Sequence, residues 1–111
     1  HKNILQFCKT LNLSYVIPSY KTESILDVAA LIEKLDLIIS PDTSIVHLAS
    51  AFNKPIISIH ENNEDSYQLF APKSEINRTV FAKYQKGIDG FSVAHLLKYC
   101  DELMKLIEIK H

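Results

Sequence analysis

Glycine is scarce in this sequence, which has only two Gly among 111 residues, at positions 87 and 90. The glycine-rich phosphate loops of dinucleotide-binding and P-loop proteins are therefore both excluded. No apolar run reaches the roughly 18 residues of a membrane-spanning helix, so we expect no transmembrane segment. Positive charge is not in excess either, because 12 Lys and Arg are balanced by 13 Asp and Glu. A dedicated nucleic-acid-binding surface is therefore not expected.

Cysteine is also scarce, and its pattern does not suggest a metal site. Cys8 and Cys100 are far apart in the chain and lack the spacing of metal ligands. Both have apolar neighbours at helical spacing, which predicts ordinary packing of reduced thiols. The stretch from His60 to Asp65 contains His and three acidic residues, but a solvated acidic loop explains it better than a metal site. We therefore expect no bound metal.

The sequence does contain an alternation of two hydrophobic periods. Apolar residues at helical spacing predict helices at 4–11, 24–35, 44–52 and 92–107. Short apolar runs predict strands at 14–17, 37–39, 56–59 and 79–82, and runs without polar alternation are typical of strands buried on both faces. Residues 60–74 are polar and are predicted to be irregular. Strands alternating with helices predict an α/β fold with an open parallel sheet.

Local signals refine the ends and faces of these helices. Asn12 suits the end of the first helix, and Ser24 with Asp27 three residues later resembles a capping box. On the last helix, apolar residues at helical spacing predict one buried face. The expected members of that face are Val93, Leu96, Leu97, Cys100, Leu103, Met104 and Ile107.

The segment with the clearest chemistry follows the strand at 37–39. In open α/β sheets, ligands bind beyond the carboxyl ends of the strands, and a helix N-terminus there attracts phosphate. Thr43 and Ser44 add hydroxyl donors, and His47 lies on the same helix face. Protonated His47 would stabilise a leaving diphosphate. The simpler alternative is that Asp42 or Thr43 only caps the helix and His47 is an ordinary surface residue.

Residues 36–55, DLIISPDTSIVHLASAFNKP, resemble the signature of glycosyltransferase family 9, the ADP-heptose:lipopolysaccharide heptosyltransferases. The family pattern is a buried strand, Asp-Thr-Gly, two residues, His-Leu-Ala, and then Lys-Pro before another buried strand. Upstream, KTESIL at 21–26 and AAL at 29–31 resemble the family's Lys-Thr-Ser-Leu and Ala-Ala-Leu helix. The resemblance covers residues 15–60, and it extends to the final strand and helix only in their layout.

This resemblance implies a GT-B glycosyltransferase, which has two Rossmann-like domains with the active site between them. Residues 1–111 would be most of the C-terminal nucleotide-sugar-binding domain, a three-layer open parallel sheet whose first strand would precede His1. The N-terminal acceptor domain, which holds the catalytic carboxylate base, would be absent. No catalytic residue is therefore expected in this chain, and alone it should not catalyse transfer.

The resemblance also implies roles for residues on two segments. Thr43, Ser44 and His47 would contact the diphosphate of the donor, and Asp42 would lie near the sugar. Lys21, Thr22 and Glu23 would lie near the base and ribose. The implied reaction is inverting transfer of a sugar, from ADP-heptose or a related nucleotide sugar, to a lipid-linked lipopolysaccharide or lipooligosaccharide core. No metal or other cofactor is implied, and the implied location is cytoplasmic, peripheral to the inner membrane.

Two departures from the family pattern affect these expectations. Ser44 replaces the Gly of Asp-Thr-Gly, and its Cβ would narrow the approach of backbone to phosphate. Residues 60–63, HENN, replace a Phe-Gly-Pro-Thr-like turn, so part of the substrate pocket is expected to differ. Tyr67, Phe70 and Pro72 either pack the long loop onto the body or line an acceptor cleft. Two alternatives remain: a non-catalytic nucleotide- or phosphate-binding module, and a purely structural interaction domain.

Overall fold

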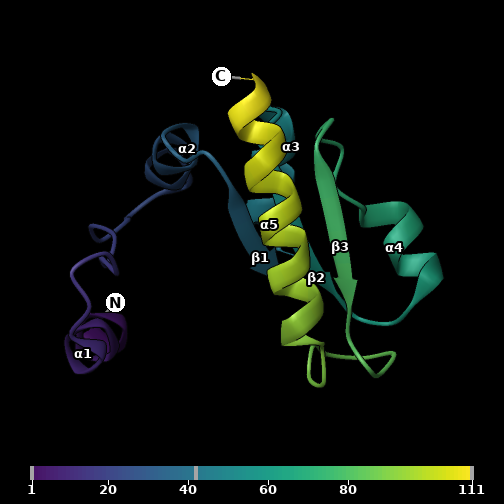
Figure 1. The fold of residues 1–111 in the computed structure, drawn as a ribbon, viewed down its shortest axis with the longest axis horizontal. Coiled ribbons are helices and arrows are strands. Elements are labelled where there is room, and N and C mark those ends of the chain that lie inside the picture. Colours follow the sequence, from purple (N-terminus) through teal and green to yellow (C-terminus); the bar gives the residue numbers. More distant parts are fainter. Residues whose placement is uncertain (1, 42, 111) are drawn as a thin grey trace.

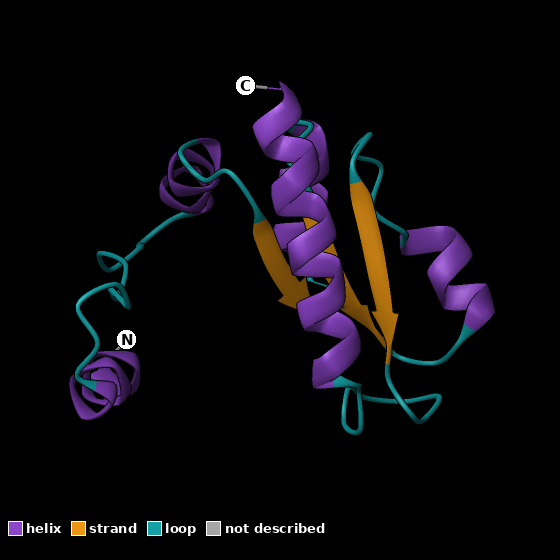
Figure 2. Ribbon diagram, viewed as in Figure 1, coloured by secondary structure: helices purple, strands orange, loops and turns teal. Residues whose placement is uncertain are grey.

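The computed structural model describes residues 2–41 and 43–110, and within them the chain alternates between helices and strands (Figure 2). The helices are α1 (Lys2–Leu11), α2 (Ile25–Glu33), α3 (Ser44–Ala51), α4 (Glu64–Phe70) and α5 (Val93–Lys110). The strands are β1 (Ile38–Pro41), β2 (Ile56–His60) and β3 (Asn77–Phe81). The prediction of an α/β fold is confirmed.

The three strands form one parallel sheet in the order β1-β2-β3 (Figure 1). Ile38 pairs with Ile56, and Ile56 pairs with Asn77, so the strands start level with one another. Every residue of the central strand β2 is buried, as expected for a run without polar alternation. The same expectation is wrong for β1, where buried and exposed residues alternate and Ile39 is 48% exposed. The carboxyl ends of all three strands consequently lie at one edge, where the turns into α3 and α4 begin.

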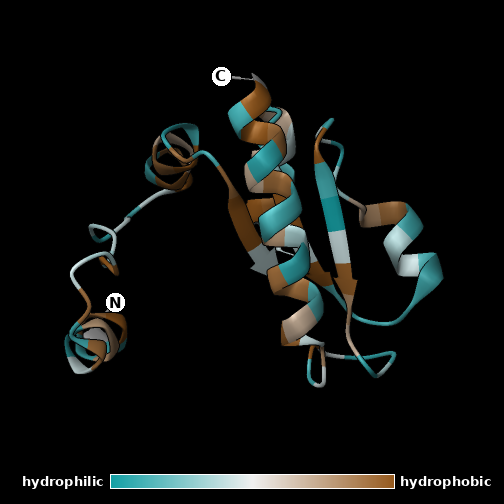
Figure 3. Cartoon of the chain, in the orientation of Figure 1, coloured by the Kyte–Doolittle hydropathy of each residue, from teal (hydrophilic) through white to brown (hydrophobic). Residues whose placement is uncertain are grey.

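Two hydrophobic clusters hold helices on the two faces of this sheet. On the first face, α2 and α3 pack on β1 and β2 through Ile32, Ile38, Val46, Ala49 and Ile56. On the second face, α5 packs on β2 and β3 through a cluster whose buried members are Ile57, Val80 and Leu103. Ile56 and Ile57 serve opposite faces because successive strand residues point in opposite directions. The result is the expected three layers. In Figure 3, β1 is largely hydrophobic, whereas β3 begins hydrophilic and becomes hydrophobic toward its carboxyl end.

The predicted strand at 14–17 is wrong. Residues 16–23 have no regular structure, and the side chains of Tyr15 and Ile17 are 78% and 80% exposed. This segment lies away from the sheet, between α1 and α2 (Figure 1). A strand needs a neighbouring strand to pair its backbone N–H and C=O groups. The apolar pattern at 14–17 is therefore not enough to form a strand, because this segment has no strand beside it. Asn12, in contrast, ends α1 as predicted, with a left-handed φ of 50° and its N–H bonded to the carbonyl of Cys8.

Two further expectations need correction. The stretch 60–74 is not wholly irregular, because it contains α4, which Asn63 caps by accepting a hydrogen bond from the Ser66 N–H. On α5, Leu103 and Ile107 are buried, but three residues predicted for the buried face are exposed: Val93, Leu97 and Met104. These three lie outside the cluster through which α5 packs on β2 and β3, to which α5 contributes Leu103 with the partly buried Leu96, Tyr99 and Cys100. No helix in the described part of the chain is long and apolar enough to cross a membrane.

Candidate functional site

The candidate site begins where β1 ends and α3 starts. Thr43 has extended backbone, with φ −141° and ψ −179°, and it is the N-cap of α3. Its Oγ1 accepts a hydrogen bond from the Ile45 N–H at 3.3 Å, and its carbonyl accepts one from the Val46 N–H at 3.0 Å. Buried Ser40, on β1, lies 3.3 Å from the same hydroxyl. Thr43 is thus fixed at the carboxyl edge of the sheet, and the capping interpretation applies to it.

The first turn of α3 presents a polar face to solvent. Thr43, Ser44 and His47 are exposed, whereas Val46 and Ala49 on the opposite face are buried in the first hydrophobic cluster. This division arises because residues three and four apart share one side of a helix. Burial of the apolar face therefore fixes the direction in which the hydroxyls and the imidazole point.

This turn has the chemistry of an anion-binding site. The first N–H groups of a helix have no carbonyl partner within the helix, and the helix dipole places partial positive charge there. Thr43 already engages the N–H groups of Ile45 and Val46. Ser40 Oγ donates its proton to the Pro41 carbonyl at 2.8 Å, so the Thr43 hydroxyl is the donor in its contact with Ser40 Oγ. A phosphate would therefore meet the N–H and hydroxyl of Ser44 and the imidazole of His47, and the Thr43 hydroxyl only when its proton turns away from Ser40.

The other predicted site residues are not joined to this turn in the described part of the chain. Asp42 lies outside the described residues. Lys21, Thr22 and Glu23 lead into α2, where the Glu23 N–H donates to Asp27 Oδ2 at 3.0 Å and the Asp27 N–H donates to Ser24 Oγ at 3.3 Å. The N-cap role of Ser24 is confirmed. Among residues 2–41 and 43–110, no hydrogen bond or ion pair connects Lys21–Glu23 with Thr43, Ser44 or His47.

One neighbour of the site comes from α4, which the sequence pattern did not predict. The ring of Phe70 meets the ring of His47 edge-on, with centroids 6.3 Å apart and planes at 69°. The Tyr67 hydroxyl lies 3.0 Å from Thr79 Oγ1 and ties α4 to β3. Of the two interpretations of these aromatic residues, Tyr67 fits packing. A helix-start signal for α4 was present in Asn63 followed by two acidic residues.

The stretch that departs from the family turn is occupied by a packed aromatic cluster. His60 is buried, and its Nδ1 lies 2.8 Å from the carbonyl oxygen of Glu61. The His60 ring contacts the rings of Tyr67 and Phe81 edge-on, with centroids 5.4 Å and 6.4 Å away. Glu61 Oε2 accepts a hydrogen bond from the Gly87 N–H at 3.0 Å. The described residues contain no group of three or more His, Cys, Asp or Glu arranged to hold a metal.

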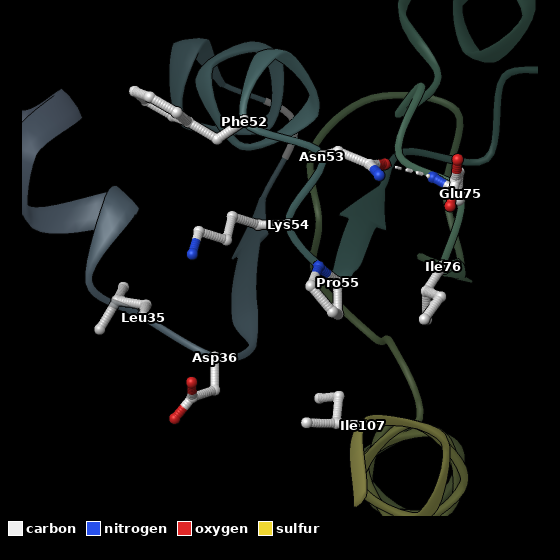
Figure 4. Close-up of a pocket in the computed structure, with 9 residues that line it drawn as sticks. All are labelled: Leu35, Asp36, Phe52, Asn53, Lys54, Pro55, Glu75, Ile76 and Ile107. Atoms are coloured by element: carbon white, nitrogen blue, oxygen red, sulfur yellow. Dashed lines mark hydrogen bonds between the residues drawn. The ribbon is translucent and has the colours of Figure 1, made fainter. Parts of the chain in front are cut away.

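A hollow of about 370 Å³ lies at the opposite edge of the sheet, at the amino ends of the strands (Figure 4). It is lined by Leu35, Asp36, Phe52, Asn53, Lys54, Pro55, Glu75, Ile76 and Ile107. Its polar backbone is largely used within the fold: Asn53 Oδ1 accepts from the Glu75 N–H at 2.9 Å, and the Lys54 N–H donates to the Ala49 carbonyl. Ligands of open α/β sheets bind at the other edge, so we do not assign this hollow as the site.

Comparison with known proteins decides the family. The sequence model of glycosyltransferase family 9 (heptosyltransferase) matches residues 20–91, more than half of the 111-residue chain. The chain belongs to glycosyltransferase family 9. The match runs from the loop before α2 to the residues before α5, and so includes every predicted site residue. No curated protein matches the chain, and no solved structure matches it.

Membership of glycosyltransferase family 9 accounts for the architecture and narrows the chemistry. The family has the GT-B fold, and the three-stranded parallel sheet with helices on both faces fits a Rossmann-like part of that fold. At the level of the family, the chemistry is heptosyltransferase-like glycosyl transfer, which uses a nucleotide-sugar donor and an acceptor.

Proposed function

We propose that this chain is the donor-binding part of an inverting glycosyltransferase that transfers a sugar from a nucleotide diphosphate to a lipopolysaccharide or lipooligosaccharide core. The observation that carries the proposal is the exposed first turn of α3. There Thr43, Ser44 and His47 face solvent together at the carboxyl edge of a parallel sheet, within the segment that matches the family.

In this proposal the diphosphate binds against the start of α3. The Ser44 N–H and hydroxyl donate hydrogen bonds to phosphate oxygens. The Thr43 hydroxyl does so as well once its proton turns from Ser40 Oγ to the ligand. His47, when protonated, adds a charge-assisted hydrogen bond. As the bond between the sugar and the diphosphate breaks, negative charge grows on the leaving phosphate, and these donors stabilise it. Asp42 would lie near the sugar, and Lys21, Thr22 and Glu23 would lie near the base and ribose.

The rest of the reaction requires groups from outside these residues. Direct displacement at the anomeric carbon needs an acceptor hydroxyl and a base that removes its proton. We propose that a carboxylate in a separate acceptor-binding domain supplies that base. The donor would be ADP-heptose or a related nucleotide sugar, bound without a metal. The acceptor class would place the enzyme in the cytoplasm, at the inner face of the membrane where the lipid-linked core is assembled.

The test is calorimetric titration of the chain with ADP, UDP, GDP and CDP in the absence of metal. We expect one nucleotide to bind, and we expect His47→Ala to weaken its binding by about tenfold or more. A hydrogen bond to a charged group contributes about 1.5–3 kcal/mol, and each 1.4 kcal/mol is a factor of ten in affinity.

His95→Ala is the matched control, because His95 is also an exposed histidine near the start of a helix, but on α5. It should leave nucleotide affinity unchanged. If a folded sample binds none of the four nucleotides, the donor-binding proposal is wrong and a structural role for the domain is favoured. If His47→Ala and His95→Ala behave alike, the site is not at the start of α3.

A further inference from the structure

Phe70 stands between two anchors that fix its position beside α3. Before it, α4 is tied to β3 by the 3.0 Å contact of the Tyr67 hydroxyl with Thr79 Oγ1. After it, the chain is bonded to α3, where the Lys73 N–H donates to Ser50 Oγ at 2.9 Å. A side chain held from both directions keeps its place without support from a ligand.

Packing nevertheless buries only part of the Phe70 side chain. It contacts the His47 ring edge-on at 6.3 Å, yet 47% of its surface is exposed. An aromatic residue of this size usually buries most of its surface in a core or an interface. Phe70 is therefore a partly exposed aromatic residue in contact with His47 of α3.

The α4 side of α3 has an aromatic side chain beside the candidate site. Figure 1 shows α2 on one side of α3 and α4 on the other. The α4 flank brings the apolar ring of Phe70 next to His47. A diphosphate at the start of α3 would thus have a flat aromatic surface on its α4 side.

We propose that Phe70 is a ligand-binding and specificity-determining residue. Its exposed ring forms an apolar wall that packs against the face of a ring joined to the diphosphate. This inference rests on the proposed function and adds to it a contact beyond the phosphates. The packed ring comes from one of two sources, the nucleobase or the sugar of the donor, and both present an apolar face to an aromatic side chain.

The experiment measures the affinity of the 111-residue chain for three probes of increasing size. These are pyrophosphate, the nucleoside diphosphate that binds best among ADP, UDP, GDP and CDP, and the glucose conjugate of that nucleotide. Each is titrated into wild type, Phe70→Ala, Phe70→Leu and Leu69→Ala. Leu69 is the matched control, since it precedes Phe70 on α4 and its apolar side chain is 73% exposed. Far-ultraviolet circular dichroism shows that each variant is folded.

We expect Phe70→Ala to leave pyrophosphate affinity within twofold of wild type and to weaken a larger probe by about tenfold, the size of a lost aromatic contact. Phe70→Leu should be intermediate, and Leu69→Ala should match wild type. If Phe70→Ala already weakens binding of the nucleoside diphosphate, Phe70 contacts the nucleobase. Loss seen only with the glucose conjugate assigns it to the sugar.

Three results would overturn the inference, and they can be told apart. If wild type binds the larger probes and Phe70→Ala does too, Phe70 is not in the site, while the proposed function stands. If Phe70→Ala weakens pyrophosphate as much as the larger probes, Phe70 acts only by holding His47. If wild type binds none of the probes, the proposed function fails and this inference fails with it.

Discussion

The two edges of the sheet use their polar groups in opposite ways. At the carboxyl edge, Thr43, Ser44 and His47 turn their side chains to solvent around the start of α3. At the amino edge, polar groups bond to one another: Asn53 Oδ1 receives the Glu75 N–H, and the Ile38 N–H donates to the Pro55 carbonyl. A hollow of about 370 Å³ lies at the amino edge, and one of about 500 Å³ lies at the carboxyl edge, lined by Asn62, Asn63, Glu64, Asp65 and Gln85.

A hollow does not by itself locate a binding site in this fold, because both edges of the sheet have one. A helix that follows a parallel strand brings its N-terminus, with unpaired N–H groups and positive partial charge, to the carboxyl edge. A helix that precedes a strand brings its C-terminus to the amino edge. Binding of an anion is therefore expected at the first edge, and variants at the second should change stability without changing affinity.

The largest effect should come from Ile56→Ala at the amino edge. Ile56 is fully buried at the start of β2, in the cluster formed with α2 and α3. Removing a buried side chain of this size leaves a cavity and lowers the free energy of unfolding by about 3 kcal/mol. Urea denaturation measures this loss. Pyrophosphate affinity of the folded fraction should not change.

Ile39→Ala is the matched control, because Ile39 is also a strand isoleucine but is 48% exposed on β1. Ile39→Ala should lower the free energy of unfolding by about 1 kcal/mol or less, because the half-exposed Ile39 side chain buries less apolar surface on folding than Ile56 does. Equal losses from the two variants would show that the first face of the sheet is not the packed core.

Asn53→Ala should have the next largest effect. The side chain of Asn53 accepts the Glu75 N–H, and its backbone has a left-handed φ of 51°, which Asn tolerates better than Ala. Loss of both advantages should lower the free energy of unfolding by about 2 kcal/mol. Asn53→Gly removes only the hydrogen bond and should cost about half as much. A change in pyrophosphate affinity in either variant would contradict the proposal that the amino edge contributes to stability and the carboxyl edge to anion binding.

Thr43→Ala should have the smallest effect on stability but should change both properties. Removing an N-cap hydroxyl costs about 1 kcal/mol of stability. At this edge the same hydroxyl is also a proposed donor to phosphate, so pyrophosphate affinity should fall by a few-fold. Thr43→Ser keeps the hydroxyl and should retain both. If Thr43→Ala lowers stability but not affinity, Thr43 is a cap and nothing more.

Hydrophobic patterns in the sequence correctly predicted the helices and strands whose apolar side chains pack into the core. The apolar runs at 37–39 and 56–59 predicted β1 and β2, and the stripe beginning at Ile25 predicted α2. The patterns were insufficient where the structure of a segment depends on which other element lies beside it. Residues 14–17 have a strand-like sequence but no strand beside them, and Val93, Leu97 and Met104 lie on a side of α5 that the sheet does not cover.

The candidate site likewise has one part that could be predicted from the sequence and one part that could not. Its core, Thr43 to His47, could be predicted because strand, turn and helix follow one another directly in the chain. The contact of Phe70 with His47 could not, because it joins residues from two helices through the packing of α4 against β3. Ser44 in place of glycine remains a testable departure, since its Cβ narrows the approach to the backbone while its hydroxyl adds a donor.

The most direct test of the account is a two-dimensional ¹⁵N–¹H NMR titration of the chain with pyrophosphate, with backbone amides assigned. Binding at the start of α3 predicts that the amide signals of Ser44, Ile45 and His47 shift in a saturable manner. The Lys54 and Ile76 amides beside the hollow should stay in place. Shifts confined to Lys54 and Ile76, or no saturable shift at any amide of a folded sample, would contradict the central claim that the carboxyl edge binds the diphosphate.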